Sequence, residues 1–235
     1  MNGPYLIGVD CGTQSAKVVV YDAAGNAVAR GQHALRPMSR PRHGVAFHPD
    51  DDLWVAIADA SRQAMKAFAG DVREIVGVGL CPIRCCKAFL KADGSLAEPV
   101  ISWMDDRAYQ PYLPDDPSVA YATTSSGYLA HRFTGQFKDT AANNIAVQWP
   151  IDTDTWQWSD DPAHYERFGV RREMLLDLQM PGEIIGGVTV EAYQEGGSTP
   201  VAMTTSAADG TYTLTITTNG APLDGYVLGK LAGKK

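Results

Sequence analysis

The sequence predicts an α/β domain that is followed by a small all-β tail, and three observations support this. Residues 5–33 contain three short apolar runs separated by polar turns, as consecutive strands do. Residues 50–70 carry apolar side chains at helical spacing, and residues 74–80 return to a strand pattern. From residue 188 onward Thr, Val and Tyr alternate with period two, and the helical signals vanish. Sheet, helix and sheet in this order indicate an α/β domain.

The three runs at the start predict a meander of consecutive antiparallel strands. A polar turn containing Gly12, Thr13 and Ser15 joins the first two runs, and the turn at residues 22–26 joins the second and third. The second turn supplies Gly and Asn, which adopt the positive φ that tight hairpins need. A meander of this kind opens each half of the ribonuclease-H-like fold, so we expect that fold here.

A helix is predicted after an irregular, Pro- and Arg-rich loop at residues 36–49. Acidic residues 50–52 fit its first turn, where the helix dipole favours negative charge, and Gly70 ends it. The stripe that we expect to pack into the core consists of Trp54, Ile57, Ser61, Ala64, Met65 and Phe68.

The elements that follow are shorter and are marked mainly by their turn residues. The strand at residues 74–80 has a buried-type composition. Further predictions are a hairpin turn at residues 92–95, a helix at 125–134 closed by Gly135, a strand pair at 149–158, two short helices at 162–168 and 171–178, and a hairpin turn at 206–210.

Composition excludes several functional classes. The chain has 235 residues, 45% of them hydrophobic, which is enough to bury the core of one large or two small domains. A net charge of -7 argues against nucleic acid as the main partner. No stretch approaches the roughly 20 apolar residues of a membrane span, and the start lacks a basic region and apolar leader. We therefore expect a cytoplasmic protein without membrane contact, and reduced thiols at Cys11, Cys81, Cys85 and Cys86.

The turn after the first strand has the residues of a phosphate site. Gly12, Thr13 and Ser15 suit a loop whose N–H groups and hydroxyls face a phosphate chain, and Lys17 would add a positive charge. Asp10 ends the first strand and could hold a hydrated Mg²⁺, which needs few carboxylates. The alternative is an ordinary hairpin with a polar turn.

A second group of residues suits a sugar or polyol. Arg84 follows a predicted strand, and Trp103, Asp105 and Arg107 end the next one. An aromatic face beside a carboxylate and a guanidinium can take both the C–H face and the hydroxyls of a sugar. The alternative is a surface salt bridge beside a core tryptophan.

These two patterns resemble the FGGY carbohydrate kinases, which have a ribonuclease-H-like fold of the actin/hexokinase type. D-x-G-T-x-S-x-K at Asp10–Lys17 is similar to the first phosphate loop of that family, W-x-D-x-R at Trp103–Arg107 is similar to its substrate element, and the order of matches extends over roughly residues 5–190. The resemblance implies ATP-dependent phosphorylation of a sugar or polyol, with Mg²⁺ as cofactor. Cys85 and Ile83 depart from the family pattern and leave the substrate open.

The sequence also departs from the family in ways that predict weak or absent activity. Only 17 residues separate Arg107 from Ser125, where the family carries a longer segment. A Gly-Gly-Asp-type motif with the catalytic Asp, and the second, nucleotide-binding lobe, are not matched. We therefore interpret residues 1–186 as an incomplete, shortened N-terminal domain, with the catalytic residue unknown.

Residues 187–235 form the predicted all-β tail, which resembles a carboxypeptidase-regulatory-like β-sandwich module. Its T-x-x-x-D-G-x-Y-x-L motif at residues 205–214 carries that resemblance. The alternative is the next strand pair of the kinase followed by unrelated sequence.

Three interpretations of the whole chain follow. It is a carbohydrate kinase that uses ATP if a second lobe is supplied, a non-catalytic sugar-binding or scaffold protein, or a gene fragment or fusion. The partners expected are a sugar or polyol, ATP and, through the tail, further copies of the chain by self-association.

Overall fold

The computed structural model describes residues 4–113, 116–180, 189–194, 200–205 and 225–230, the last three by their backbone alone. Its centre is a sheet with the strand order β3-β2-β1-β4. β1 and β3 run antiparallel to β2, whereas β4 runs parallel to β1. The strands are β1 (Tyr5–Cys11), β2 (Ser15–Tyr21), β3 (Ala27–Ala34) and β4 (Ile75–Pro82). The predicted meander is confirmed.

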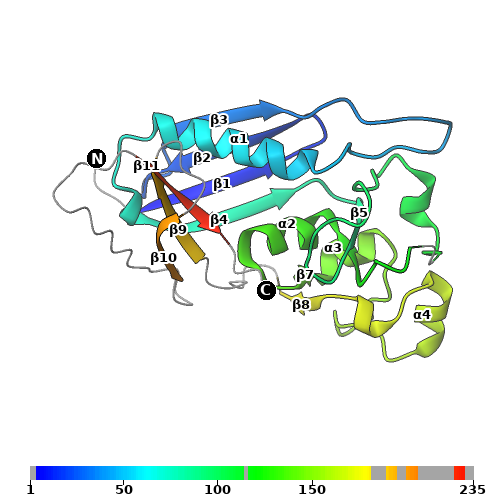
Figure 1. Ribbon diagram of the computed structural model, residues 1–235. Coiled ribbons are helices and arrows are strands. Elements are labelled where there is room, and N and C mark those ends of the chain that lie inside the picture. Colours follow the sequence, from blue (N-terminus) through cyan, green and yellow to red (C-terminus); the bar gives the residue numbers. More distant parts are fainter. Residues whose placement is uncertain (1–3, 114–115, 181–188, 195–199, 206–224, 231–235) are drawn as a thin grey trace.

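Helix α1 (Asp52–Ala67) lies across this sheet, mainly over β2 and β3 (Figure 1). It approaches β3 so closely that Gly31 has no room for a side chain. A Cβ there would lie 2.0 Å from the backbone oxygen of Ala60 and 2.6 Å from the backbone nitrogen of Ala64. Since backbone atoms cannot move aside as a flexible side chain can, the contact depends on small residues on both elements.

The predicted stripe of α1 was only partly right. The helix buries Ile57 and Ala64 as expected, but Ser61 is half-buried and the closest contact is made by small residues instead. Trp54 packs at the periphery, edge-on to Phe133 with ring centroids 5.2 Å apart. Large side chains are kept off the centre because the helix and β3 nearly touch. The buried face is Asp52, Leu53, Ala56, Ile57, Ala60 and Ala64.

Short elements make up the rest of the α/β domain. β5 (Lys87–Leu90) pairs antiparallel with β6 (Tyr121–Thr124), and β7 (Lys138–Thr140) pairs parallel with β8 (Asp177–Gln179). None of the helices in the described ranges is long and apolar enough to cross a membrane. The remaining helices are α2 (Ser125–Thr134), α3 (Ala141–Ala146) and α4 (Pro162–Phe168), with 3-10 turns η1 (Val72–Glu74), η2 (Asp106–Tyr109) and η3 (Arg172–Met174).

Helices α2 and α4 begin and end where the sequence predicts. Thr124 caps α2 by accepting a hydrogen bond from the Ser126 N–H, and Gly135 ends it in the left-handed conformation with φ 62°. Asp161 and Gly169, with φ 67°, do the same for α4. Both helices are thus delimited by local capping chemistry.

A buried carboxylate, that of Asp139, anchors the start of α2. It accepts hydrogen bonds from the hydroxyls of Thr123 at 3.0 Å and Thr124 at 2.8 Å, from the Ser126 hydroxyl, and from the Thr140 N–H at 2.7 Å. Four donors satisfy the charge without a cation, so β6, α2 and β7 meet at one point.

Three predictions about regular structure were wrong in part. The strand pair expected at residues 149–158 is a single bridge between Ile151 and Trp158. The helix expected over residues 171–178 is only the turn η3 followed by β8. β4 is not fully buried, since Val76 is 53% and Val78 51% exposed. β4 is the strand of the described sheet farthest from β3, and α1 covers mainly β2 and β3, so α1 leaves these side chains uncovered.

The tail contains strands, as expected. β9 (Thr189–Gln194), β10 (Pro200–Thr205) and β11 (Gly225–Lys230) form an antiparallel sheet in the order β10-β9-β11. The predicted hairpin turn at residues 206–210, and most of the motif at 205–214, lie outside the described residues.

We predict that Gly31→Ala strongly destabilises the protein, because a methyl group collides with the backbone of α1. Overpacking of this kind costs roughly 1–3 kcal/mol or more. Gly79→Ala is the matched control, since a Cβ on that strand glycine meets its nearest atom only at 4.0 Å. Urea unfolding of both variants checks this, and equal midpoints would contradict the close contact.

Candidate functional site

The two groups of predicted site residues follow neighbouring parallel strands. In β1, Asp10 and Cys11 pair in register with Cys81 and Pro82 of β4. The predicted phosphate turn follows β1, and the segment with Arg84 follows β4. Ligands bind most often at the carboxyl ends of such strands. The structure therefore brings the two predicted groups to one edge of the sheet.

Asp10 presents an open carboxylate at this edge. Its side chain is 54% exposed, and its described partner is Lys17 on β2, with Nζ 3.5 Å from Oδ2. The two residues are directly opposite each other in the β1–β2 register. An exposed ion pair of this length is weak, so the carboxylate remains accessible to a cation.

The turn itself is uncrowded. A Cβ on Gly12 would find no atom closer than the Ser15 backbone oxygen at 3.8 Å. The Gly12 N–H donates to that same oxygen at 3.0 Å and so is not directed at a ligand, in contrast to the expectation from the sequence. The Ser15 hydroxyl accepts from the Gln32 amide at 3.3 Å, and Thr13 is half-buried.

These donors fit a magnesium-bound phosphate chain. Mg²⁺ keeps most of its waters and is held by one or two carboxylates, as an open Asp10 allows. The Thr13 and Ser15 hydroxyls and the Lys17 ammonium are groups that bind phosphate oxygens. In the described part of the chain no cluster of three or more His, Cys, Asp or Glu could hold a metal by itself.

Arg84 and Trp103 are exposed side chains on adjacent segments. Hydrogen bonds between the backbones of Lys87 and Ile101, 3.1 Å and 2.9 Å long, tie these segments together. The Arg84 guanidinium lies 3.4 Å from the Ala142 carbonyl of α3, and no described carboxylate pairs with it. Trp103 is 43% exposed. Both side chains are thus available to a ligand.

Cys85, directly after Arg84, adopts the left-handed conformation with φ 60°. A residue other than glycine is strained there, and such strain concentrates at binding sites. The bend separates exposed Arg84 from buried Cys86. Burial raises the pKa of the Cys86 thiol, and likewise that of Cys11, to about 12, so neither is a nucleophile at neutral pH.

Asp105 is buried and already saturated with protein donors. Oδ1 accepts from the backbone N–H of Arg107 at 2.9 Å and its Nε at 3.0 Å, and Oδ2 accepts from the Ala46 N–H and the Arg107 guanidinium, both at 2.8 Å. Burial alone raises the pKa of a carboxyl, but these hydrogen bonds outweigh it and lower the pKa of Asp105. Little capacity is left for a sugar hydroxyl.

Arg107 is held at the surface of this arrangement. Its side chain is 42% exposed, it forms the ion pair with Asp105, and a second carboxylate oxygen, on Glu98, lies 3.5 Å away. The Tyr109 hydroxyl, on the same turn η2, donates to the Trp103 carbonyl at 3.1 Å. Trp103 and Arg107 are thus fixed relative to each other.

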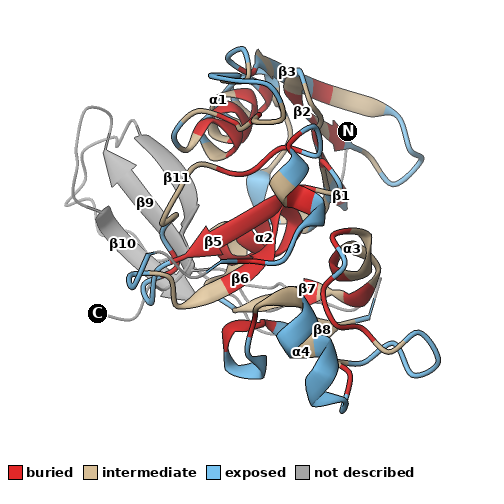
Figure 2. Cartoon of the chain, turned by 90° about the vertical axis from the view of Figure 1, so that its right-hand side faces the viewer, coloured by how far each residue is buried: buried red, intermediate tan, exposed pale blue. Residues whose placement is uncertain are grey.

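Sequence reasoning missed Lys87, which is 2% exposed although it carries a charge. It lies on β5, a strand buried along its whole length (Figure 2). Its ammonium donates to the carbonyls of Gln110 at 2.8 Å and Arg107 at 3.3 Å and lies 4.3 Å from the centre of the Trp149 ring. The signal in the sequence that could have identified Lys87 was a single charged residue at the start of the otherwise apolar strand β5.

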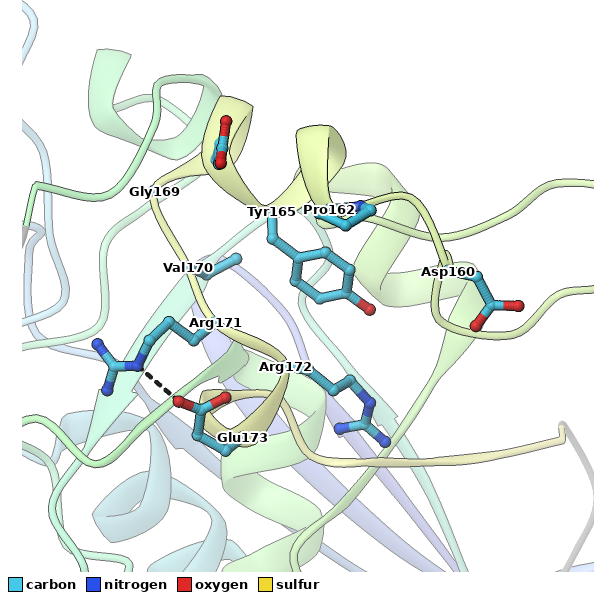
Figure 3. A pocket seen from close by; sticks show the side chains of 9 residues that line it. Asp160, Pro162, Tyr165, Gly169, Val170, Arg171, Arg172 and Glu173 are labelled. Carbon is cyan, nitrogen blue, oxygen red and sulfur yellow. Dashed lines mark hydrogen bonds and ion pairs between the residues drawn. The ribbon is translucent and has the colours of Figure 1, made fainter.

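A hollow of about 440 Å³ lies elsewhere, on α4 and the turn after it (Figure 3). Its arginines are already engaged by the protein, because Arg171 pairs with Glu173 at 2.7 Å and Arg172 donates to the Leu175 carbonyl at 2.9 Å. None of the predicted site residues contributes to it. The lining consists of Asp160, Pro162, Tyr165, Glu166, Gly169, Val170, Arg171, Arg172 and Glu173.

Comparison with known sequences gives a consistent result. Residues 5–112 match the model of the FGGY family of carbohydrate kinases, N-terminal domain. The Escherichia coli K12 protein "Uncharacterized sugar kinase YgcE" is 50% identical over 192 residues, which are 82% of this chain and 39% of that protein. An autoinducer-2 kinase of Yersinia enterocolitica is 25% identical over 86% of this chain and 45% of its own length. The chain thus spans less than half of these relatives.

Solved structures agree on the fold. A gluconate kinase from Lactobacillus acidophilus superposes with a TM-score of 0.64 at 19% identity, over 77% of this chain and 43% of that one. Plasmodium falciparum glycerol kinase gives 0.60 at 15% identity, over 74% and 43%. The predicted actin/hexokinase-type α/β fold is confirmed. The β-sandwich resemblance of the tail gains no support from these comparisons.

We predict that Asp105→Asn destabilises the protein by about 2 kcal/mol, because an amide leaves the Arg107 guanidinium without its buried counter-charge. The loss is below that of a fully buried pair since Arg107 is half exposed. Asp71→Asn is the matched control: Asp71 binds Arg73 through the same two-residue spacing, but at the surface. Urea unfolding should show a much smaller change for the control, and equal effects would contradict the role of burial.

We also predict that Lys87 makes stability increase with pH. Burial lowers the pKa of its ammonium from an ordinary 10.5 to about 8. Below pH 8 both folded and unfolded chains are protonated and the cost of burying the charge is fully present. Between pH 8 and 10.5 the unfolded chain binds more protons, so wild type gains up to about 3 kcal/mol relative to Lys87→Met. Urea unfolding from pH 7 to 10 checks this; parallel curves would contradict it.

Proposed function

We propose that this chain, whose residues 5–112 match the model of the FGGY family of carbohydrate kinases, N-terminal domain, forms the sugar-binding side of a kinase site. The reaction is transfer of the terminal phosphoryl group of Mg-ATP to a hydroxyl of a sugar or polyol. The observation that carries the proposal is the meeting of the two candidate groups at the ends of β1 and β4. Such a transfer needs the acceptor hydroxyl and the phosphate chain at one place.

Each candidate residue has a role consistent with its surroundings. Exposed Arg84 would donate to substrate hydroxyls, and the half-exposed Trp103 ring would cover the apolar face of the sugar. Asp105 would act indirectly, by orienting Arg107. Around the phosphates, Asp10 would hold hydrated Mg²⁺ while Thr13, Ser15 and Lys17 bind phosphate oxygens, and Gly12 would keep the turn open for their approach. Bound ATP supplies the phosphoryl group.

We further propose that these 235 residues, tested alone, have little or no kinase activity. Among the candidate sugar contacts Asp105 is the one carboxylate, and it is saturated by four protein donors. It is therefore a poor base for the acceptor hydroxyl, and lack of a base costs roughly 10²–10⁴-fold in rate. A second nucleotide-binding lobe, as the family resemblance implies, would have to supply the rest.

A non-catalytic sugar-binding protein is the second candidate function. The observation that favours it is the same saturated carboxylate, together with exposed Arg84 and Trp103. We propose a cytoplasmic location for either function. A binder stabilised by sugar would be indifferent to Mg-ATP, whereas an enzyme responds to both.

The test is ADP release from Mg-ATP with glycerol, erythritol, D-xylulose and D-ribulose, alongside thermal shifts with each sugar. We expect no turnover above that of Asp10→Ala. We expect at least one sugar to raise the melting temperature in wild type but not in Arg84→Gln. Turnover that disappears in Asp10→Ala would establish the kinase and overturn the proposed inactivity, while no thermal shift with any sugar would count against the sugar site.

A further inference from the structure

Lys87 is a buried cation whose contacts serve one structural element. Its ammonium has no carboxylate partner among the described residues, and its pKa is lowered by burial alone. Its two hydrogen bonds go to the carbonyls of Arg107 and Gln110, which lie within and directly after the 3-10 turn η2. The face of Trp149 completes its surroundings.

The direction of these bonds suits the end of a helical turn. The last carbonyls of a helix lack intrahelical partners and carry partial negative charge. An ammonium there both satisfies the acceptors and complements the dipole. Lys87 thus fastens the end of η2 to β5, a strand whose residues are all buried.

Burying the Lys87 ammonium to make this contact costs free energy that burying an apolar side chain would not cost. Removing a charge from water is expensive, and two carbonyls and an aromatic ring compensate for it only in part, as the lowered pKa indicates. A methionine of similar length would fill the same space without that cost. The buried ammonium of Lys87 is therefore better explained by its holding η2 in place than by a contribution to the stability of the protein.

The turn that Lys87 holds, η2, carries part of the candidate sugar site. Turn η2 carries Arg107, whose guanidinium is bound to Asp105, and Tyr109, whose hydroxyl donates to the Trp103 carbonyl. A shift of η2 would therefore move the Arg107 guanidinium and the Trp103 backbone together. Displacements of about 1 Å are enough to weaken a preorganised site considerably.

We propose that Lys87 is a positioning residue of the sugar site: by binding the carbonyls of Arg107 and Gln110 it fixes the turn that carries Arg107 and that holds the backbone of Trp103 through Tyr109. This inference rests on the proposed sugar site. The inference extends the proposed sugar site by naming a residue, Lys87, that touches no sugar and acts through the η2 backbone.

Hydrogen exchange followed by mass spectrometry tests the fastening without any ligand. In Lys87→Met, peptides covering residues 103–110 should exchange at least about tenfold faster, while peptides over residues 5–21 keep their rates. Lys87→Gln retains one donor and should give intermediate rates, which also covers the case in which Lys87→Met does not fold. Ile57→Val, a buried change in α1, is the control for general loss of stability and should leave residues 103–110 unaffected.

Calorimetric titration with D-xylulose and glycerol tests the effect on binding. Lys87→Met should weaken the binding of whichever probe wild type binds by about tenfold, and Ile57→Val should not. Combined with Arg107→Gln, Lys87→Met should add little, because both act through one group. If the role of Lys87 were merely structural, Lys87→Met would change the melting temperature but leave the dissociation constant and this coupling unchanged.

The outcomes separate the inference from the proposed function. Unchanged exchange at residues 103–110, or unchanged affinity in Lys87→Met, overturns the role of Lys87 while the sugar site stands. If wild type binds neither probe, the sugar site fails at this position and the inference fails with it. Faster exchange together with weaker, non-additive binding supports the proposal.

Discussion

The parallel pairing of β1 with β4 is the interaction on which the candidate site depends. Parallel neighbours cannot be joined by a hairpin, so the chain must cross over the sheet between them, and α1 makes that crossing. The crossing succeeds because Gly31 lets the helix rest directly on β3. A tight helix on one face therefore determines that two segments distant in sequence, the turn after Asp10 and the segment with Arg84, open at the same edge.

Charge in the second half of the site is arranged in an unusual way. Asp105 has more protein donors than a single ion pair would give it, and Lys87 has no anion at all among the described residues. Both are buried and both bind η2: Asp105 caps its start by accepting from the Arg107 N–H, and Lys87 donates to the Arg107 and Gln110 carbonyls. The surface residue Arg107 is thus held by two buried polar groups, Asp105 and Lys87, which fix the turn.

Local chemistry accounts for what could be predicted from the sequence. The meander, the caps of α2 and α4 and their closing glycines depend on residues within a few positions of one another. The family resemblance predicted both halves of the candidate site. What sequence could not show depends on contacts between distant segments, such as the bond from the Ala46 N–H to Asp105, 59 positions away. The exposure of β4 and the small-residue face of α1 likewise depend on how α1 packs against the sheet.

The register of β1 and β4 has a practical consequence for thiol chemistry. Cys81 is exposed and lies directly opposite Asp10, whereas Cys11 and Cys86 are buried with pKa values near 12, and Cys85 is half-buried. Alkylating reagents need an accessible thiolate, so the buried pair is protected from them. The sequence therefore offers an attachment point for a fluorophore beside the carboxylate that we propose to hold magnesium. Events at that carboxylate could be followed optically in a protein that retains all four of its cysteines.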